Sequence, residues 1–142
     1  MMYSLAELIE RLSQSMQDHE DSVIRKSEFA NLTLTQIHYL DAIRHFENPP
    51  TISQLADSLD ITKPTATNTI DRLENEGYVR KVPSADDRRV WYVHLTTKGL
   101  RISDLHDQIH QGYAENFEKS LNKQELDELV VLLNKVIKHI GL

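Results

Sequence analysis

Two histidines late in the sequence have the spacing of metal ligands. His106 and His110 are four residues apart, so on a helix both imidazoles project from one face. At about 100° per residue they lie beside Ile102, Tyr113 and Phe117, and we expect this face to be at least partly buried. A buried imidazole needs a hydrogen-bond partner or a metal ion. The pair therefore indicates either a metal site or a structural polar contact.

The same two histidines also resemble the metal-binding helix of a metal-dependent hydrolase. Asp107 then stands where such a helix carries a glutamate base, and the shorter side chain is poorly placed for that role. No third ligand on a turn, no serine elbow and no glycine-rich phosphate loop accompanies the pair, and the chain has no cysteine. We therefore predict that the protein is not an enzyme.

A second group of side chains, between residues 63 and 75, is suited to reading DNA. Hydroxyls, amides and a guanidinium can bond base edges and phosphates in the major groove. The group consists of Lys63, Thr65, Thr67, Asn68, Asp71, Arg72 and Asn75. Arg88 and Arg89 follow in a polar loop and are suited to a minor groove, where Asp87 can hold the loop by accepting hydrogen bonds. The alternatives are a solvated helix face and a surface ion-pair cluster worth about 0–1 kcal/mol.

The composition agrees with a DNA-binding protein only in the middle of the chain. The 142 residues carry a net charge of −6, yet residues 61–90 hold six basic and five acidic side chains and are alone in having a positive balance. Hydrophobic residues make up 39%, enough for a core. No stretch approaches the about 20 apolar residues of a membrane span, and Met1 begins no secretory signal. Without cysteine, a thiol redox sensor is excluded. We predict a soluble, cytoplasmic protein that does not enter membranes.

Hydrophobic periodicity and capping residues predict four helices before residue 77. They cover residues 5–26, 33–46, a short stretch from Ser53, and 63–76. Thr33 and Gln36 form a capping-box pattern at the start of the second helix. Thr62 caps the fourth, and Gly77 ends it. The fourth helix places Ala66, Ile70 and Leu73 on one face and the DNA-reading group on the other.

The pattern then changes to that of a β-hairpin followed by two more helices. Residues 78–82 and 90–95 are β-branched and aromatic runs that predict two strands, with the charged loop 83–89 between them. One long helix opens at Thr96 or Thr97, and the last follows a capping box at Asn122. The order α-α-α-α-β-β-α-α is mainly α and predicts a winged helix-turn-helix.

These residues resemble the MarR family of transcriptional regulators. The resemblance lies in the stretches 32–36, 52–56 and 62–78, in the wing Asp87-Arg88-Arg89, and in Leu95-Thr96-Thr97-Lys98-Gly99. It implies a homodimer that binds double-stranded DNA at a pseudo-palindromic operator, and it favours a repressor. We assign residues 1–32 to an N-terminal dimerisation helix, 33–99 to the DNA-binding domain and 100–142 to C-terminal dimerisation helices.

The resemblance also suggests how the regulator is controlled. It extends to the zinc-responsive repressors of the family, whose ligands carry over to Glu20, His38, His106 and His110. One carboxylate and three imidazoles suit tetrahedral Zn²⁺. Their secondary site would fall on Lys26, Ile37 and Leu105, which are poor ligands, so we expect one zinc per subunit.

Two alternatives to zinc control stay open. The chain also resembles the fatty-acid-synthesis regulators of the family, in which the histidines and the glutamate would be a structural polar network. An organic effector, phenolic or acyl, would then bind between the DNA-binding and dimerisation regions. Ile37, Tyr39, Tyr113 and Phe117 could line its site, although all four can equally be core residues.

Overall fold

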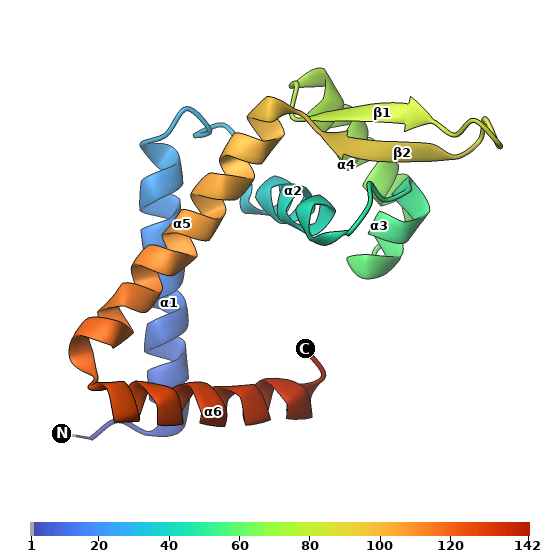
Figure 1. Ribbon diagram of the computed structural model, residues 1–142. Coiled ribbons are helices and arrows are strands. Elements are labelled where there is room, and N and C mark those ends of the chain that lie inside the picture. The colour runs from blue at the N-terminus through green and yellow to red at the C-terminus, as the bar shows by residue number, and fades with distance from the viewer. Residues whose placement is uncertain (1) are drawn as a thin grey trace. The chain divides into compact units, whose positions relative to one another are not determined.

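The computed structural model describes residues 2–142, so Met1, the first residue of the predicted N-terminal segment, lies outside the described residues. These residues form helices α1 to α4, a hairpin of strands β1 and β2, and helices α5 and α6, as the sequence predicted (Figure 1). The chain divides into two compact units, Met1–His19 with Gln108–Leu142, and Glu20–Asp107. We call the first the helical unit and the second the winged unit.

Capping residues set the starts of the first four helices. The helices are α1 Leu5–Arg25, α2 Leu34–His45, α3 Ile52–Ser58 and α4 Lys63–Asn75. The capping box predicted at Thr33 is present, with reciprocal bonds to Gln36. The prediction that α3 begins at Ser53 was wrong by one residue. Thr51 is the cap, because Gln54, three residues later, returns a hydrogen bond of 2.9 Å to its backbone N–H.

The hairpin and the last two helices follow the predicted order. Strands β1 Val79–Pro83 and β2 Trp91–Leu95 pair antiparallel, with Val79 opposite Leu95 and Pro83 opposite Trp91. Helix α5 spans Thr97–Ser120, and α6 spans Lys123–Ile140 behind the capping box of Asn122. Both strands begin one residue later than the sequence pattern indicated.

The core of the winged unit joins α2, α3 and α4 to the hairpin. Leu40, Leu55, Ile70, Leu73 and Val93 are fully buried, one or two from each of these helices and one from β2. Burying each such side chain contributes about 1.5–3 kcal/mol. The predicted inward face of α4 is confirmed, and its opposite face is consequently left at the surface.

The base of the hairpin is fastened to the end of α4 and the start of α5. Gly77 has φ +84°, a value that favours glycine, and lets the chain turn out of α4. Thr96 Oγ1 then donates to the carbonyl oxygens of Gly77 (2.6 Å) and Tyr78 (3.1 Å). Gly99 fits only because it has no side chain, since a Cβ there would stand 2.2 Å from the Tyr78 carbonyl oxygen. The wing is thus held at its base.

The helical unit exposes much of its apolar surface. Tyr113 Oη donates to the carbonyl oxygen of Leu12 (3.3 Å), which ties α5 to α1. Helix α6 has no buried residue. Its exposed apolar side chains are Val130, Val131, Leu132, Leu133, Val136, Ile137 and Ile140. Within the described residues, no helix combines the length and the apolar character needed to cross a bilayer.

Candidate functional site

The outward face of α4 carries the polar group predicted from the sequence. Lys63, Thr65, Asn68 and Arg72 are exposed, and Thr67 is half-buried. The Thr65 hydroxyl already has one partner in the protein, because its Oγ1 lies 2.8 Å from Oγ1 of Thr62, the cap of α4. The Thr65 backbone N–H donates to the same Thr62 oxygen. The face therefore presents amide, guanidinium and ammonium groups from a helix whose other side is anchored in the core.

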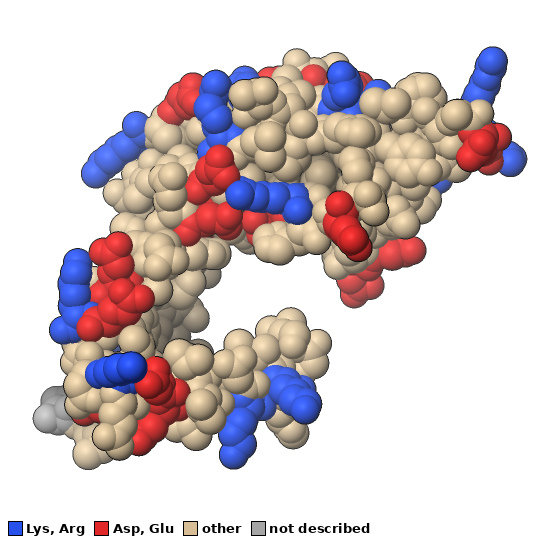
Figure 2. All heavy atoms as spheres, in the orientation of Figure 1, with Lys and Arg blue, Asp and Glu red and all other residues tan. Residues whose placement is uncertain are grey.

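The wing loop is held in shape by Asp87. Its Oδ1 accepts from the backbone N–H of Arg89 (3.0 Å) and from Nε (3.2 Å), while its Oδ2 accepts from Nη2 (3.3 Å). The Arg89 side chain, followed by its backbone N–H, holds the pKa of Asp87 below its usual value. Arg88 is exposed at the same loop. At the far end of the hairpin, basic and acidic atoms lie together (Figure 2).

A hollow separates the start of α4 from the wing. It has a volume of about 420 Å³ and is lined by Lys63 and Thr67 of α4, Lys81 of β1, and Arg89 and Trp91 of the hairpin. Hydroxyls of Thr51 and Ser53 complete its wall. Lys81 is paired with Asp71 and Arg89 with Asp87, so Lys63 is the cation of this hollow that has no ion pair among the described residues. The hollow joins the start of α4 and the wing in one surface that carries basic and hydroxyl-bearing residues.

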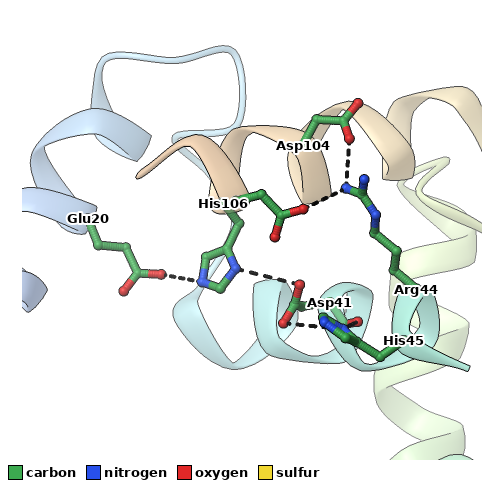
Figure 3. A network of polar contacts seen from close by, with 7 residues as sticks. Glu20, Asp41, Arg44, His45, Asp104 and His106 are labelled. Carbon is green, nitrogen blue, oxygen red and sulfur yellow. Dashed lines mark hydrogen bonds and ion pairs between the residues drawn. The ribbon is translucent and has the colours of Figure 1, made fainter. Parts of the chain in front are cut away.

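The predicted metal ligands meet in part. Ligand atoms of Glu20, His38 and His106, from α1, α2 and α5, all lie within 4.8 Å of one another. His106 is 4% exposed, and its Nε2 lies 2.8 Å from Glu20 Oε1 (Figure 3). The His38 and His106 rings meet edge-on, with centroids 6.0 Å apart. Asp41 faces the other side of the imidazole, with Oδ1 3.7 Å from Nδ1.

An ion-pair network extends from this cluster along α2 and α5. Arg44 Nη1 lies 2.7 Å from Asp104 Oδ1 and 3.2 Å from Asp107 Oδ2 (Figure 3). These pairs connect α2 to α5 at Asp104 and Asp107, which precede and follow His106 along α5. Neither Asp41 nor Arg44 was singled out from the sequence, because each finds its partner about 60 residues away. Their positions, three residues apart on one helix, were the available signal.

The remaining predictions concern the burial of His110 and the side chains that could line an effector site. The predicted burial holds for His106 but not for His110, which is exposed. His110 lies on the part of α5 that belongs to the helical unit, and its role as a fourth ligand stays a prediction. Of the side chains considered for an organic effector, Ile37 and Tyr39 are buried in the winged core. Tyr113 and Phe117 line an apolar hollow of about 530 Å³ within the helical unit.

Comparison with known proteins identifies the winged unit. The model of the MarR family matches residues 32–91. A curated relative, the uncharacterized HTH-type transcriptional regulator YybA of Bacillus subtilis (strain 168), is 29% identical over 118 residues. That match covers 82% of this chain and 79% of the relative.

Solved structures of two regulators share the fold over almost their whole length. Streptococcus pneumoniae FabT, crystallised in complex with DNA, is 27% identical with a TM-score of 0.81, covering 96% of this chain and 97% of that one. The reduced form of MarR from E. coli is 28% identical with a TM-score of 0.72, covering 96% and 98%.

Proposed function

Because the chain belongs to the MarR family of DNA-binding transcriptional regulators, we propose that it acts as a homodimeric repressor of a pseudo-palindromic operator. Members of this family regulate transcription and are not enzymes, so the hydrolase interpretation of His106 and His110 is wrong. The observation that carries the proposal is the shared surface of α4 and the wing. One anchored helix there presents polar groups beside an arginine-tipped loop.

Helix α4 and the wing loop would contact different grooves of the DNA. We assign major-groove contacts to α4, whose outward face presents groups that bond base edges and phosphates. These residues are Lys63, Thr65, Thr67, Asn68 and Arg72. Arg88 and Arg89 would enter the adjacent minor groove, where the negative potential is concentrated. The hydrogen bonds that Arg89 donates to Asp87 support this role, because they reduce the side-chain freedom lost on binding.

The helical unit supplies the dimer interface. We assign residues 1–32 and 100–142, which contain the helical unit and also residues 20–32 and 100–107 of the winged unit, to the pairing of two copies about a two-fold axis, and residues 33–99 of each copy to DNA binding. The exposed apolar surface of α6, where Val131 is 60% exposed and Ile140 59%, supports this assignment. So does the exposed row Leu5, Leu8, Ile9, Leu12 and Met16 on α1. A two-fold dimer reads two half-sites about 34 Å apart, one turn of DNA.

Selection from a random duplex pool tests this function. We expect the protein to enrich a pseudo-palindrome and to bind it with an affinity that falls steeply as salt increases. Arg89→Ala removes one cation from each subunit of the dimer and should therefore lower the salt slope by about 1.8. The matched control is Lys135→Ala, an exposed cation on α6, which should bind as the parent does. Failure to enrich any sequence, or a monomer in solution at micromolar concentration, would contradict the proposal.

A metal effector is the second candidate, and the Glu20–His38–His106 cluster favours it. A carboxylate oxygen and two imidazole nitrogens match the ligands of Zn²⁺. Ligand atoms on a tetrahedral zinc stand about 3.3 Å apart. The 2.8 Å contact between Glu20 and His106 would therefore have to open slightly. With His110 as the fourth ligand, one zinc per subunit would link α1, α2 and α5, and we propose that it strengthens operator binding.

Zinc content distinguishes this candidate from a structural network. Equilibrium dialysis should give one zinc per subunit for the parent and none for Glu20→Gln or His106→Asn. His139→Asn, which removes an exposed histidine from the last turn of α6, is the control. Unchanged zinc content in the two variants, or tighter operator binding after chelation, would contradict metal control. An organic effector in the Tyr113–Phe117 hollow would then be the candidate to test, with phenolic and acyl ligands in a thermal-shift assay.

A further inference from the structure

The side chain of Lys81, a residue of β1, contacts α4. Its Nζ donates a hydrogen bond to Asp71 Oδ1 on that helix. The same Nζ lies 3.8 Å from Glu74 Oε1, one turn further along α4. The Lys81 side chain is only 22% exposed, so this ion pair is partly shielded from water. Such pairs are screened by salt less than surface pairs are.

The backbone repeats the connection made by the side chain. Glu74 Oε2 accepts a hydrogen bond of 2.6 Å from the Lys81 N–H. β1 pairs with β2 along one edge, where Lys81 is opposite Val93, and Glu74 thus satisfies a donor on the other edge. Two carboxylates of α4, from Asp71 and Glu74, therefore bind one residue of β1. The connection joins the two elements that would contact DNA.

Lys81 also contacts the strand that returns from the wing loop. Its Nζ lies 5.7 Å from the centre of the Trp91 ring, within the range of a cation–π interaction. Trp91 pairs with Pro83, so the two residues flank the loop that carries Arg88 and Arg89. Trp91 is the single tryptophan of the chain, so tryptophan fluorescence reports only on the surroundings of the Lys81–Trp91 contact.

The position of Asp71 explains why this contact matters for DNA binding. Asp71 lies on α4 beside Thr67 and Arg72, and its side chain is 46% exposed. A carboxylate without a cation would repel DNA phosphates at this surface. We propose that Lys81 is a positioning residue, which fixes the wing to α4 and neutralises Asp71, rather than a phosphate contact. This rests on the DNA-binding role of α4 and the wing.

A double-mutant cycle on the selected duplex tests the proposal. Lys81→Met should weaken binding by about tenfold, since it frees Asp71, and Lys81→Arg should restore binding to within about twofold of the parent. The double variant Lys81→Met/Asp71→Asn removes both charges and should recover to within about threefold, with the salt slope of the parent. Asp71→Asn alone should stay within about threefold. Trp91 emission should change in Lys81→Met but not in Lys81→Arg.

The double variant decides the question even if Lys81→Met fails to fold, because it removes the charge of Asp71, and Glu74 keeps its hydrogen bond from the backbone N–H of residue 81. Binding as weak as that of a phosphate-contact variant, with a slope lower by about 1.8 for the two subunits of the dimer, would overturn the positioning role. Parent-like binding by a folded Lys81→Met would also overturn it. The matched control is Lys63→Met, which removes the α4 cation that lines the same hollow and should not be rescued by Asp71→Asn. If the parent itself binds no DNA, the proposed function fails rather than this inference.

Discussion

Two glycines on one helix should respond to alanine with opposite signs. Gly99 and Gly112 both lie in α5, where alanine is favoured over glycine by about 1 kcal/mol. A Cβ at Gly99 would meet the Tyr78 carbonyl oxygen at 2.2 Å and Leu95 Cδ2 at 3.2 Å. A Cβ at Gly112 would have a single neighbour, His19 Nε2, at 4.0 Å. The structure therefore predicts a clash at one position and free space at the other.

The loss of stability in Gly99→Ala depends on whether the Tyr78 carbonyl can move away from the added Cβ. The Tyr78 carbonyl oxygen accepts from Thr96 Oγ1 and from the Thr96 N–H, so it cannot withdraw without disturbing both bonds. Overpacking costs about 1–3 kcal/mol, and we place this rigid backbone contact at the upper end. Subtracting the gain of about 1 kcal/mol in helix propensity leaves Gly99→Ala destabilised by about 2 kcal/mol. Gly112→Ala should instead be more stable by about 0.5–1 kcal/mol.

Urea denaturation followed by circular dichroism measures both variants. The protomer concentration must be equal throughout, because the apparent stability of a dimer depends on it. Thermal melting should move in the same directions, by about 3 °C for each kcal/mol. If Gly99→Ala were as stable as Gly112→Ala, the close approach of α5 to the wing base would be refuted.

Three further predictions concern the wing, the core and the dimer. The pKa of Asp87, measured by carboxyl NMR, should lie below the usual value of about 3.9 and return toward it in Arg89→Gln. Because the pKa of Asp87 is lowered in the folded protein, its stabilisation of the wing loop is fully present at a pH above the usual value. This stabilisation is lost as the pH falls through the folded pKa. Leu55→Ala, at a position 0% exposed, should cost about 2–5 kcal/mol in urea denaturation, and a loss below 1 kcal/mol would contradict its place in the core. Leu133→Asp should shift the protein to monomer in sedimentation, whereas Asn134→Asp, next to it on α6, should leave the dimer intact if apolar contact holds the two copies together.

The local parts of this fold were predictable because their signals are short-range. Thr33 and Gln36 meet within one helical turn, and so do Asn122 and Glu125, so the residue types alone predict both caps. The start of α3 shows where this reasoning fails. Ser53 is itself a good cap, and only the bond between Thr51 and Gln54 distinguishes the two candidates.

The contacts that join elements could not be predicted in this way. Lys81 and Asp71 are ten residues apart, on a strand and a helix whose relative placement follows from the core. The face of α4 was predictable from its periodicity, and Asp71 was correctly placed on it. Its pairing depends on the distance between β1 and α4, which no pattern within either element contains. The polar residues that we propose for DNA contact were thus foreseeable as a group, and the contacts that orient them were not.

The surroundings of His106 show why the sequence left its role open. A histidine that binds a metal usually donates its second ring N–H to a carboxylate, which fixes the ring. His106 has a carboxylate near each ring nitrogen, with Glu20 Oε1 2.8 Å from Nε2 and Asp41 Oδ1 3.7 Å from Nδ1, too long for a hydrogen bond. The same two carboxylates would also satisfy an imidazole that binds no metal, at a position where it must have partners. Asp41→Asn separates the two roles, because removing the carboxylate beside the second ring nitrogen of a metal-binding histidine typically lowers metal affinity by about 10–100-fold. A variant that binds zinc as the parent does would assign Asp41 to the ion-pair network alone.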